Sequence, residues 1–373
     1  MLHFLPKPYA KIARLLLAVL FLALAYFLIS AELASLPLEN AAFAMDWKGI
    51  WQALQGGKIH YGPSLRNPPW SLLPILPLGF LPLVESWALL SLGTLWVMML
   101  SVPRSSKRVL YVLSVVLLIS SYPSVRHLVD GNFEGLVLAG LLLLLYGYRE
   151  RNPTAFAFGL LLASAKPQET WLVLPIIVGA TLLHWPKRTI GHYSALVALV
   201  ALPSLAVYND EWVQSVVSIE QRGSFMDSSL IATATRLAVP AGMIAVLWGG
   251  LLAVTLYVTY TLRNDEFSSL HAAFWVAAAL LLAPYAAGNS LLIVVALGMI
   301  PLFLETPWLG FLLLVGTDAQ YVFSASFRYS TSATYITALL LLSWATLGVY
   351  LQYRQPPPLV AHEQHGAHEK ALD

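Results

Sequence analysis

Long hydrophobic runs separated by short polar segments make up most of this chain. Runs of roughly 15–25 apolar residues are long enough to cross a bilayer as helices. The pattern therefore predicts an all-α, polytopic integral membrane protein with about 12 transmembrane helices. The predicted spans are residues 14–31, 84–101, 109–121, 133–148, 153–165, 170–185, 190–208, 237–262, 268–283, 290–304, 308–324 and 332–353.

One interruption of this pattern is much longer than a connection between two helices needs to be. Residues 31–83 form a predicted first outer loop that contains both aromatic and charged side chains. Within it, residues 43–55 place apolar side chains at helical spacing, which predicts a short helix in the membrane interface with its tryptophans at headgroup depth. The apolar stripe consists of Trp47, Ile50, Trp51 and Leu54.

The end of this loop is hydrophobic but rich in proline. Pro74, Pro77 and Pro82 fall within residues 71–83, which is too many for a regular spanning helix. Irregular backbone at membrane depth is tolerated where it is buried in protein or lines a wet cavity. We therefore expect a re-entrant or interfacial segment that leads into the second span.

Composition supports the membrane assignment. Hydrophobic residues make up 58% and charged residues 11% of the chain, whereas a soluble domain carries about 25% charged residues. The chain has no cysteine, which excludes disulfides, thiolate metal sites and cysteine nucleophiles. A net charge of +2, without a basic stripe, does not indicate a nucleic-acid partner.

The basic residues indicate an orientation. With the N-terminus in the cytoplasm, thirteen Lys and Arg residues fall in inside segments and eight fall outside, which agrees with the positive-inside rule. Both termini are then cytoplasmic. We expect one transmembrane domain over residues 1–355 and a disordered, proline-rich cytoplasmic tail over residues 356–373.

The predicted outer face carries ionisable and amide side chains from several separate loops. Charges at or near a membrane are costly and tend to mark function, so we expect these loops to form a single polar chamber. Its members include Asp46, Arg126, His127, Asp130, Asn132, Lys166, Gln168, Glu169, Arg222 and Arg328.

Three classes of membrane protein compete for such a chamber. A glycosyltransferase with a lipid-phosphate donor needs one carboxylate as general base and cations for the departing phosphate. A transporter would have paired halves with broken helices and charges near the midplane, but the chain has no clear internal repeat and its charges lie at one face. A scaffold would need neither the long first loop nor the cations beside it.

Motifs of other enzyme classes are missing from the sequence. It contains no nucleophile elbow, Walker loop, H-E-x-x-H or Gly-rich dinucleotide motif. Asp46 stands alone rather than in an Asp-x-Asp pair, so a divalent ion held by carboxylates is not indicated. We therefore expect neither a metal nor a cofactor.

Short elements along the first half of the chain carry a family resemblance. They are Asp46, Gly57-x-x-x-Tyr61, Asn67-Pro68-Pro69-Trp70, Gly131-Asn132 at the start of the fourth span, and Ala165-Lys166-Pro167-Gln168 before the sixth. In this order they resemble glycosyltransferase family 87, polyprenol-phosphate-mannose-dependent mannosyltransferases with the multi-span GT-C fold. The resemblance covers roughly residues 40–180, and the chain has Asn67-Pro68-Pro69 where family members often have Tyr-Pro-Pro.

This resemblance implies a GT-C-like fold and a hexosyltransferase of the bacterial plasma membrane that serves the cell envelope. The donor would be a polyprenyl-phosphate-linked sugar, with mannose expected first, and the acceptor a glycolipid or glycan outside the cytoplasm. In-line attack would invert the anomeric centre. By the same resemblance Asp46 is the catalytic base and Lys166 contacts the donor phosphate. The other expected donor-binding residues are Arg126, His127, Arg222 and Arg328, and those expected to support the acceptor or the loop are Tyr61, Asn67, Asn132 and Gln168.

Several of these residues also have a simpler interpretation. A carboxylate such as Asp46 is favoured at a helix start, where it can cap the helix. Lys166 could extend its ammonium to the membrane surface, and Arg126 and His127 could anchor lipid headgroups. The alternative function is a flippase or polymerase-like protein for lipid-linked glycans, which would use the same chamber without Asp46 as a base.

Overall fold

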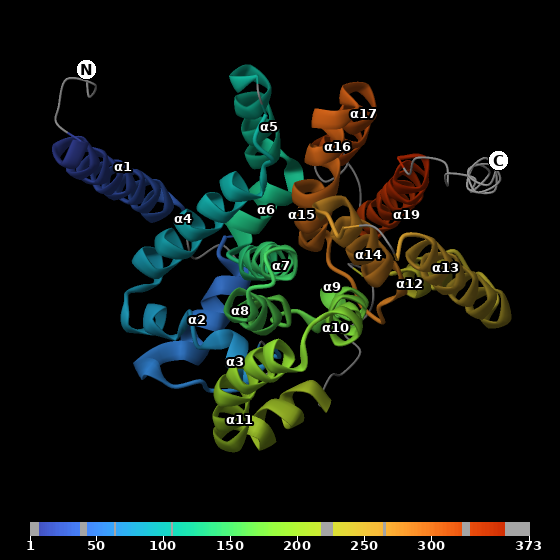
Figure 1. Ribbon diagram of the computed structural model, residues 1–373, viewed down its shortest axis with the longest axis horizontal. Coiled ribbons are helices and arrows are strands. Elements are labelled where there is room, and N and C mark those ends of the chain that lie inside the picture. The colour runs from blue at the N-terminus through green and yellow to red at the C-terminus, as the bar shows by residue number, and fades with distance from the viewer. Residues whose placement is uncertain are drawn as a thin grey trace, which may run out of the picture.

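The structure, a computed structural model, describes residues 7–37, 43–62, 65–105, 107–217, 227–263, 266–322 and 329–354. Within these residues the regular elements are helices and no strand occurs, which confirms the predicted all-α fold (Figure 1). The predictions for Arg222, for Arg328 and for the tail at 356–373 fall outside the described residues.

The predicted hydrophobic runs coincide with helices. The run at 290–304 is a continuous series of short pieces, η4 (Gly288–Ser290), α15 (Leu291–Val294), the π-helical turn η5 (Val295–Met299) and α16 (Ile300–Glu305). The other runs correspond to α1 (Lys7–Ser35), α4 (Leu83–Ser101), α5 (Arg108–Ser120), α7 (Glu134–Arg149), α8 (Pro153–Ala163), α10 (Val173–His184), α11 (Lys187–Val217), α13 (Ala241–Thr261), α14 (Ser269–Leu282), α17 (Pro307–Asp318) and α19 (Tyr329–Tyr353).

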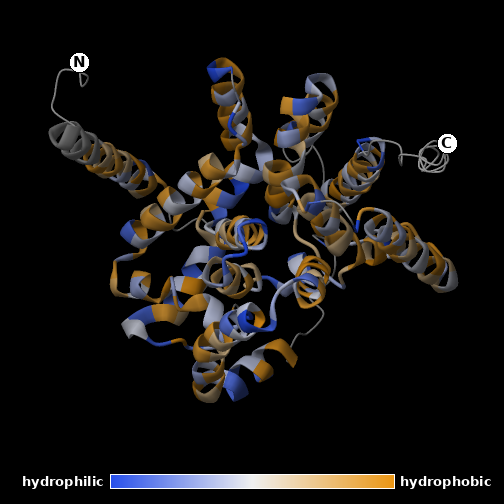
Figure 2. Cartoon of the chain, viewed as in Figure 1, coloured by the Kyte–Doolittle hydropathy of each residue, from blue (hydrophilic) through white to orange (hydrophobic). Residues whose placement is uncertain are grey.

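Fewer helices are long enough to cross a bilayer than the twelve predicted spans. Among the described residues, six helical stretches have the length and hydropathy of a span, or seven if α5 and α6 (Tyr122–Asp130), which meet at 52°, count as one. The helices α8, α10 and α14 are apolar but shorter. The outer helices consist largely of hydrophobic residues (Figure 2), and apolar side chains such as Val112 on α5 and Val246 on α13 are exposed on them. The chain is therefore a polytopic membrane protein.

The helices α7 and α8 form a tight antiparallel hairpin at the centre of the molecule (Figure 1). Glycines lie where the two backbones meet: a Cβ on Gly140 would be 2.2 Å from the backbone nitrogen of Ala163, and one on Gly159 would be 2.5 Å from that of Leu144. Small residues of this kind let helices in membranes approach closely. The turn is fixed by Asn152, whose side chain accepts hydrogen bonds from the first backbone amides of α8.

The helix α14 lies inside the rest of the bundle. All thirteen residues from Leu270 to Leu282 are buried, and a helix that is apolar on every side is expected to be enclosed. It packs against α19 and against the π-helical turn η5, where Gly298 approaches Ala273. Because α14 is enclosed, the segment that follows it is brought inward, toward α6 and α9 (Pro167–Thr170).

The first loop is built from short helical pieces. The helix predicted over 43–55 is present as α2 (Met45–Leu54), followed by η2 (Gln55–Gly57), α3 (Pro69–Leu72) and η3 (Leu76–Phe80). The expectation that the tryptophans of α2 lie at headgroup depth is wrong for Trp47, which is fully buried in the protein and donates its indole N–H to Ser86 Oγ at 2.9 Å. Residues 71–83 contain no long helix, as their prolines predict.

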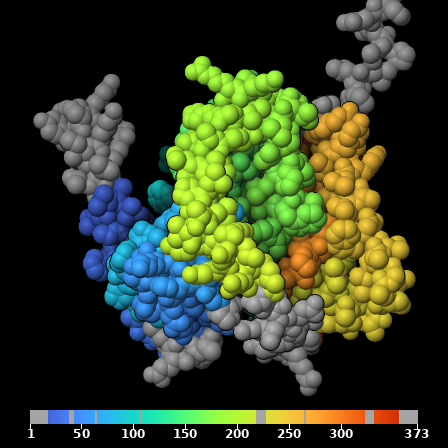
Figure 3. Space-filling model, turned by 90° about the horizontal axis from the view of Figure 1, so that it is seen from below, coloured from blue at the N-terminus to red at the C-terminus, as the bar shows by residue number. Residues whose placement is uncertain are grey.

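The long helix α11 covers this loop from one side (Figure 3). Trp212, near its end, packs edge-on against Trp70 and donates its indole N–H to the backbone carbonyl of Arg66. Residues 66–70 are therefore held between α11 and α8, because Trp70 also donates to Ser164 Oγ at 2.8 Å. At the other edge of the molecule, α1 extends away from the bundle and packs on α4 (Figure 1).

Candidate active site

Asp46 lies in the first turn of α2, which docks against α6. Ala44, the residue before the helix, adopts a left-handed conformation (φ 50°) and donates its backbone N–H to Val129 O at 2.8 Å. Asp46 does not cap the helix: its carboxylate oxygen Oδ2 accepts a hydrogen bond from Asn132 Nδ2 at 2.5 Å. The interpretation of Asp46 as a helix cap is therefore wrong, and its carboxylate is oriented by a residue from another element.

The position of Asn132 depends on Gly131, which ends α6. Gly131 has φ 69°, a left-handed conformation that favours glycine, and a Cβ there would lie 2.5 Å from Cβ of Trp47. The same corner is braced by Trp87, which donates its indole N–H to Leu128 O at 2.9 Å. The Gly-Asn step thus turns the chain sharply beside α2 and brings the amide of Asn132 to the carboxylate of Asp46.

A buried carboxylate, Glu134, joins two of the predicted donor-binding residues. Glu134 is in the first turn of α7 and is fully buried. It accepts hydrogen bonds from His127 Nδ1 at 2.7 Å and from Lys166 Nζ at 2.5 Å. Lys166 is 8% exposed and His127 is 1% exposed. Lys166 therefore does not extend to the membrane surface, and His127 does not anchor a headgroup.

A second buried carboxylate, Glu169, lies on the other side of Lys166. Its Oε1 is 3.7 Å from Lys166 Nζ and accepts a hydrogen bond from Ser290 Oγ at 2.6 Å. Within the described residues, its other oxygen is buried and has no hydrogen-bond partner. Burial raises the pKa of Glu169 to about 7, although Lys166 opposes this shift. The segment after α8 and the segment after α14 thus meet at Glu169.

Lys166 and Asp46 influence each other's charge. Burial alone would lower the pKa of Lys166, but the carboxylates of Glu134 and Glu169 hold that pKa above the ordinary lysine value, so the ammonium stays protonated. Burial raises the pKa of Asp46, and the positive charge of Lys166 is the largest influence that opposes this rise. The cation therefore favours the ionised carboxylate that a general base requires.

The remaining cation of this cluster, Arg126, lies at its edge. Its guanidinium forms an ion pair with Asp130 at 2.6 Å, and its side chain is 36% exposed, whereas that of Asp130 is almost fully buried. The other oxygen of Asp130 faces the amide of Asn289 at 3.5 Å. Arg126 is thus accessible from outside the cluster, in contrast to Lys166 and His127.

Tyr61 and Asn67 fasten the first loop to the segment that carries Lys166. Tyr61 donates its hydroxyl hydrogen to Asn67 O at 2.9 Å, and Asn67 Nδ2 donates to Ala165 O at 2.7 Å. These two predicted residues therefore act on the backbone next to Lys166. Gln168 is half-buried in α9, and no hydrogen bond of its side chain to another described residue is found.

The structure brings together Asp46, Arg126, His127, Asn132 and Lys166, as the predicted chamber requires. Arg222 and Arg328 lie outside the described residues. Glu134, which connects His127 with Lys166, was missed because it stands inside a hydrophobic run. The signal that could have found it is its charge: a carboxylate near the start of a predicted span is costly unless it is paired.

Comparison with known proteins identifies one family. The family described as Glycosyltransferase family 87 matches residues 66–284 of the chain, which is more than half of its length. The match includes Arg126, His127, Asn132 and Lys166, begins C-terminal to Asp46, and extends well beyond the stretch over which the sequence elements show the resemblance. No curated protein and no solved structure matches the chain.

Proposed function

Because the chain belongs to glycosyltransferase family 87 and is a membrane glycosyltransferase, we propose that it moves a hexose, with mannose first among the candidates, from a polyprenyl-phosphate donor to a glycolipid or glycan acceptor. The observation that carries this proposal is the carboxylate of Asp46, oriented by Asn132 and lying beside Lys166, His127 and Arg126. One oriented carboxylate near cations is the minimum that such a transfer needs.

In this mechanism Asp46 is the general base. Asn132 occupies Oδ2 of Asp46, which leaves Oδ1 free to act as the base. Oδ1 accepts the proton of the acceptor hydroxyl while the hydroxyl oxygen attacks the anomeric carbon of the donor sugar. The bond between the anomeric carbon and the lipid phosphate breaks on the opposite side, so the product has the inverted configuration. The polyprenyl phosphate leaves as an anion and needs no general acid when cations neutralise it.

Arg126 and Lys166 have different parts in this proposal. Arg126 is partly exposed and presents a guanidinium, whose geometry matches phosphate, so it can contact the donor directly. Lys166 is buried between two carboxylates, but its ammonium has three hydrogens and is held at short hydrogen-bond distance to Glu134 alone. It can thus contribute positive potential to the phosphate while it keeps Asp46 ionised. Glu134 is a positioning residue that fixes Lys166 and His127.

The proposed orientation places this site outside the cytoplasm of a bacterial plasma membrane. It is supported by the ends of the α7–α8 hairpin. Glu134 and Lys166 lie at one end, and the basic turn with Arg149 and Arg151 lies at the other. Basic residues in short loops favour the cytoplasmic side.

The test is sugar transfer by the purified protein from polyprenyl-phosphate mannose, with the glucose and galactose analogues as alternatives. We expect Asp46→Asn to lower kcat by a factor on the order of 10²–10⁴, the usual contribution of a general base. The asparagine retains an oxygen that can accept from Asn132, so the fold is preserved. A product with the inverted anomeric configuration is expected by NMR.

Each step of the proposal has an outcome that would contradict it. Full activity of Asp46→Asn would contradict the assignment of Asp46 as the general base. We expect wild-type activity to survive EDTA, and its loss would make Asp46 a metal ligand. Transfer of lipid-linked glycans across vesicles without any glycosidic bond formation would favour the flippase alternative.

A further inference from the structure

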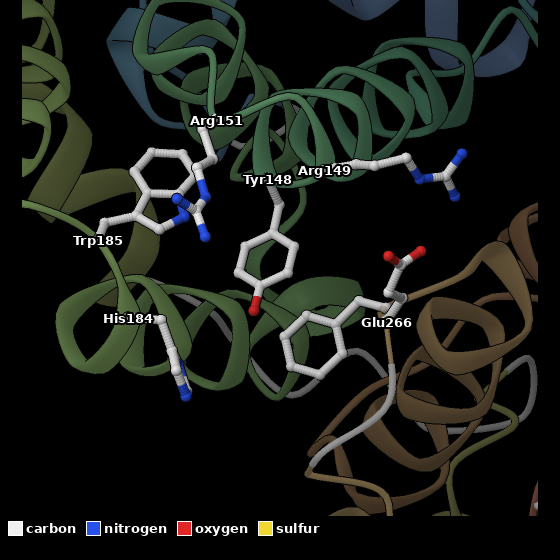
Figure 4. A pocket seen from close by; sticks show the side chains of 7 residues that line it. Tyr148, Arg149, Arg151, His184, Trp185 and Glu266 are labelled. Carbon is white, nitrogen blue, oxygen red and sulfur yellow. The ribbon is translucent and has the colours of Figure 1, made fainter.

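A cavity of about 160 Å³ lies at the end of the α7–α8 hairpin opposite to the candidate active site. The sixteen residues of α7, at about 1.5 Å each, separate the two by about 24 Å. The cavity is formed by the ends of α7 and α10 and by the start of the segment that leads into α14 (Figure 4). The lining residues that are labelled in Figure 4 are Tyr148, Arg149, Arg151, His184, Trp185 and Glu266.

One wall of this cavity is aromatic and well packed. The ring of Tyr148 stacks on Phe267 with 4.9 Å between centroids and on Trp185 with 6.1 Å. Trp185 and Phe267 are themselves buried, and Trp185 packs further against Phe156 and Tyr193. The wall therefore holds its shape without a ligand.

The polar residues around this wall are predominantly cationic. The lining contains two guanidiniums, one carboxylate, that of Glu266, and the imidazole of His184, whose Nδ1 is 2.8 Å from Ala180 O. Among the residues that the structure describes, neither Arg149 nor Arg151 forms an ion pair. In Figure 4 the side chain of Arg151 lies near Trp185 and Tyr148, and that of Arg149 extends on the side of Glu266. The cavity thus offers an excess of unneutralised donors to an anion.

The backbone at Arg151 is in a conformation that glycine would adopt more easily. Its φ is 49°, in the left-handed region, at the turn where α7 ends and α8 begins. A non-glycine residue there costs roughly 1–2 kcal/mol, so the local fold by itself favours glycine at this position. The turn nevertheless presents an arginine to the cavity.

Exposed apolar side chains adjoin the cavity. Leu182 and Leu183, in the last turn of α10 next to His184, are 57% and 81% exposed, and Tyr146 on α7 is 54% exposed. In a membrane protein such side chains face acyl chains. The cavity, which is smaller than the roughly 300 Å³ of a site for a drug-sized ligand, therefore combines cations with an apolar flank, as the headgroup and tails of an anionic lipid require.

We propose that this cavity binds the phosphate group of an anionic phospholipid, with Arg149 and Arg151 as donors and the Tyr148 wall as the packing surface. The same chemistry would bind free phosphate, and the apolar flank favours the lipid. The site is distinct from the candidate active site and does not depend on the transfer reaction. Its occupant would anchor the α7–α8 turn to one leaflet of the membrane.

The test is the thermal stability of the purified full-length protein in a neutral detergent. The protein is titrated with phosphatidylglycerol, with phosphatidylcholine, and with inorganic phosphate alone. A ligand that binds the folded state raises the Tm. We expect phosphatidylglycerol to raise the Tm with saturation and phosphatidylcholine, whose headgroup is zwitterionic, to have no such effect.

Two variants distinguish binding of the lipid in the cavity from a general effect of positive surface charge. In Arg149→Gln/Arg151→Gly we expect the phosphatidylglycerol concentration at half-effect to rise about tenfold or more, because charge-assisted hydrogen bonds are lost. Glycine suits the backbone at residue 151, so this variant should fold. Arg188→Gln removes an exposed cation on the same face but outside the cavity and should respond as wild type.

The outcomes decide between the alternatives. An unchanged response in the double variant would overturn the proposal, as would an equal loss in Arg188→Gln, which would assign the effect to surface charge. A rise in Tm with inorganic phosphate, lost in the double variant alone, would confirm the anion site and assign it to soluble phosphate rather than to a lipid.

Discussion

The carboxylate of Asp46 is partly buried next to cations, and these two influences act on its pKa in opposite directions. Burial is the larger, so the pKa lies above 3.8, the ordinary value for this group. A general base acts in its ionised form, and transfer should therefore increase as the pH rises through the raised pKa. We expect kcat/KM to decrease at acid pH, with the midpoint of the decrease above pH 3.8. A kcat/KM that stays constant down to pH 3.8 would contradict the assignment of Asp46 as the base.

Whereas activity should increase with pH, the contribution of the same carboxylate to the stability of the fold should decrease with pH. A raised pKa in the folded state means that the protonated form is favoured by folding, so this contribution is lost as the pH rises through the folded pKa. At neutral pH the ionised Asp46 is therefore a cost to the fold. For this reason Asp46→Asn is expected to retain or raise the Tm while it lowers activity, as often happens at active sites.

Lys166 can be tested separately from the carboxylates around it. Lys166→Met leaves Glu134 and Glu169 buried without their cation, and breaking a buried pair in this way costs about 3–5 kcal/mol. Lys166→Met/Glu134→Gln removes a charge of each sign and should recover much of the lost Tm. If Lys166 supports the donor phosphate, both variants should have a raised donor KM, with the acceptor KM little changed.

The double variant is the informative one. A donor KM that returns to the wild-type value together with the Tm would make Lys166 a purely structural residue. A donor KM that stays high although the double variant is stable would show that the positive charge of Lys166 supports donor binding. Kinetics at several donor concentrations, with melting curves of both variants, give the answer.

At the scale of single elements, the turn from α6 to α7 determines the geometry of the site. Gly131→Ala would put a Cβ 2.5 Å from Cβ of Trp47 and would force a left-handed conformation that costs roughly 1–2 kcal/mol for other residues. We expect a lower Tm and a loss of transfer activity, because Asn132 would no longer reach Asp46. Gly93→Ala, in α4 with open space around it, is the matched control and should change neither property.

A Gly131→Ala protein with normal kinetics would show that Asn132 does not need this turn to orient Asp46. A loss of Tm without any loss of specific activity in the folded fraction would have the same meaning. The two readouts therefore need to be measured on the same preparation.

The hydrophobic pattern predicted the helices well because each one must satisfy its own backbone in the membrane. It predicted less about contacts. The apolar stripe of α2 has the same spacing whether it faces lipid or protein, and only the structure places Trp47 against Ser86. Likewise the pairing of Glu134 with His127 and Lys166 joins three segments, and a local pattern carries no information about such pairs.

At the scale of the whole molecule, the α7–α8 hairpin separates two polar regions of different character. One end carries Asp46, Glu134 and Lys166 in a buried, mixed-charge cluster. The other end carries a cavity that is mainly cationic and next to exposed leucines. In the orientation predicted from the basic residues, the proposed transfer would take place outside the cytoplasm and the proposed anion site would contact the inner leaflet.

This orientation gives the last prediction. The chain has no cysteine, so single cysteines report their own location. His60, in the first loop, is exposed, and Ser105, in the short turn between α4 and α5, is partly exposed. We expect an impermeant maleimide to label His60→Cys in intact cells and Ser105→Cys after the membrane is opened. Labelling of both in intact cells would contradict the topology, and the reverse pattern would place the site in the cytoplasm.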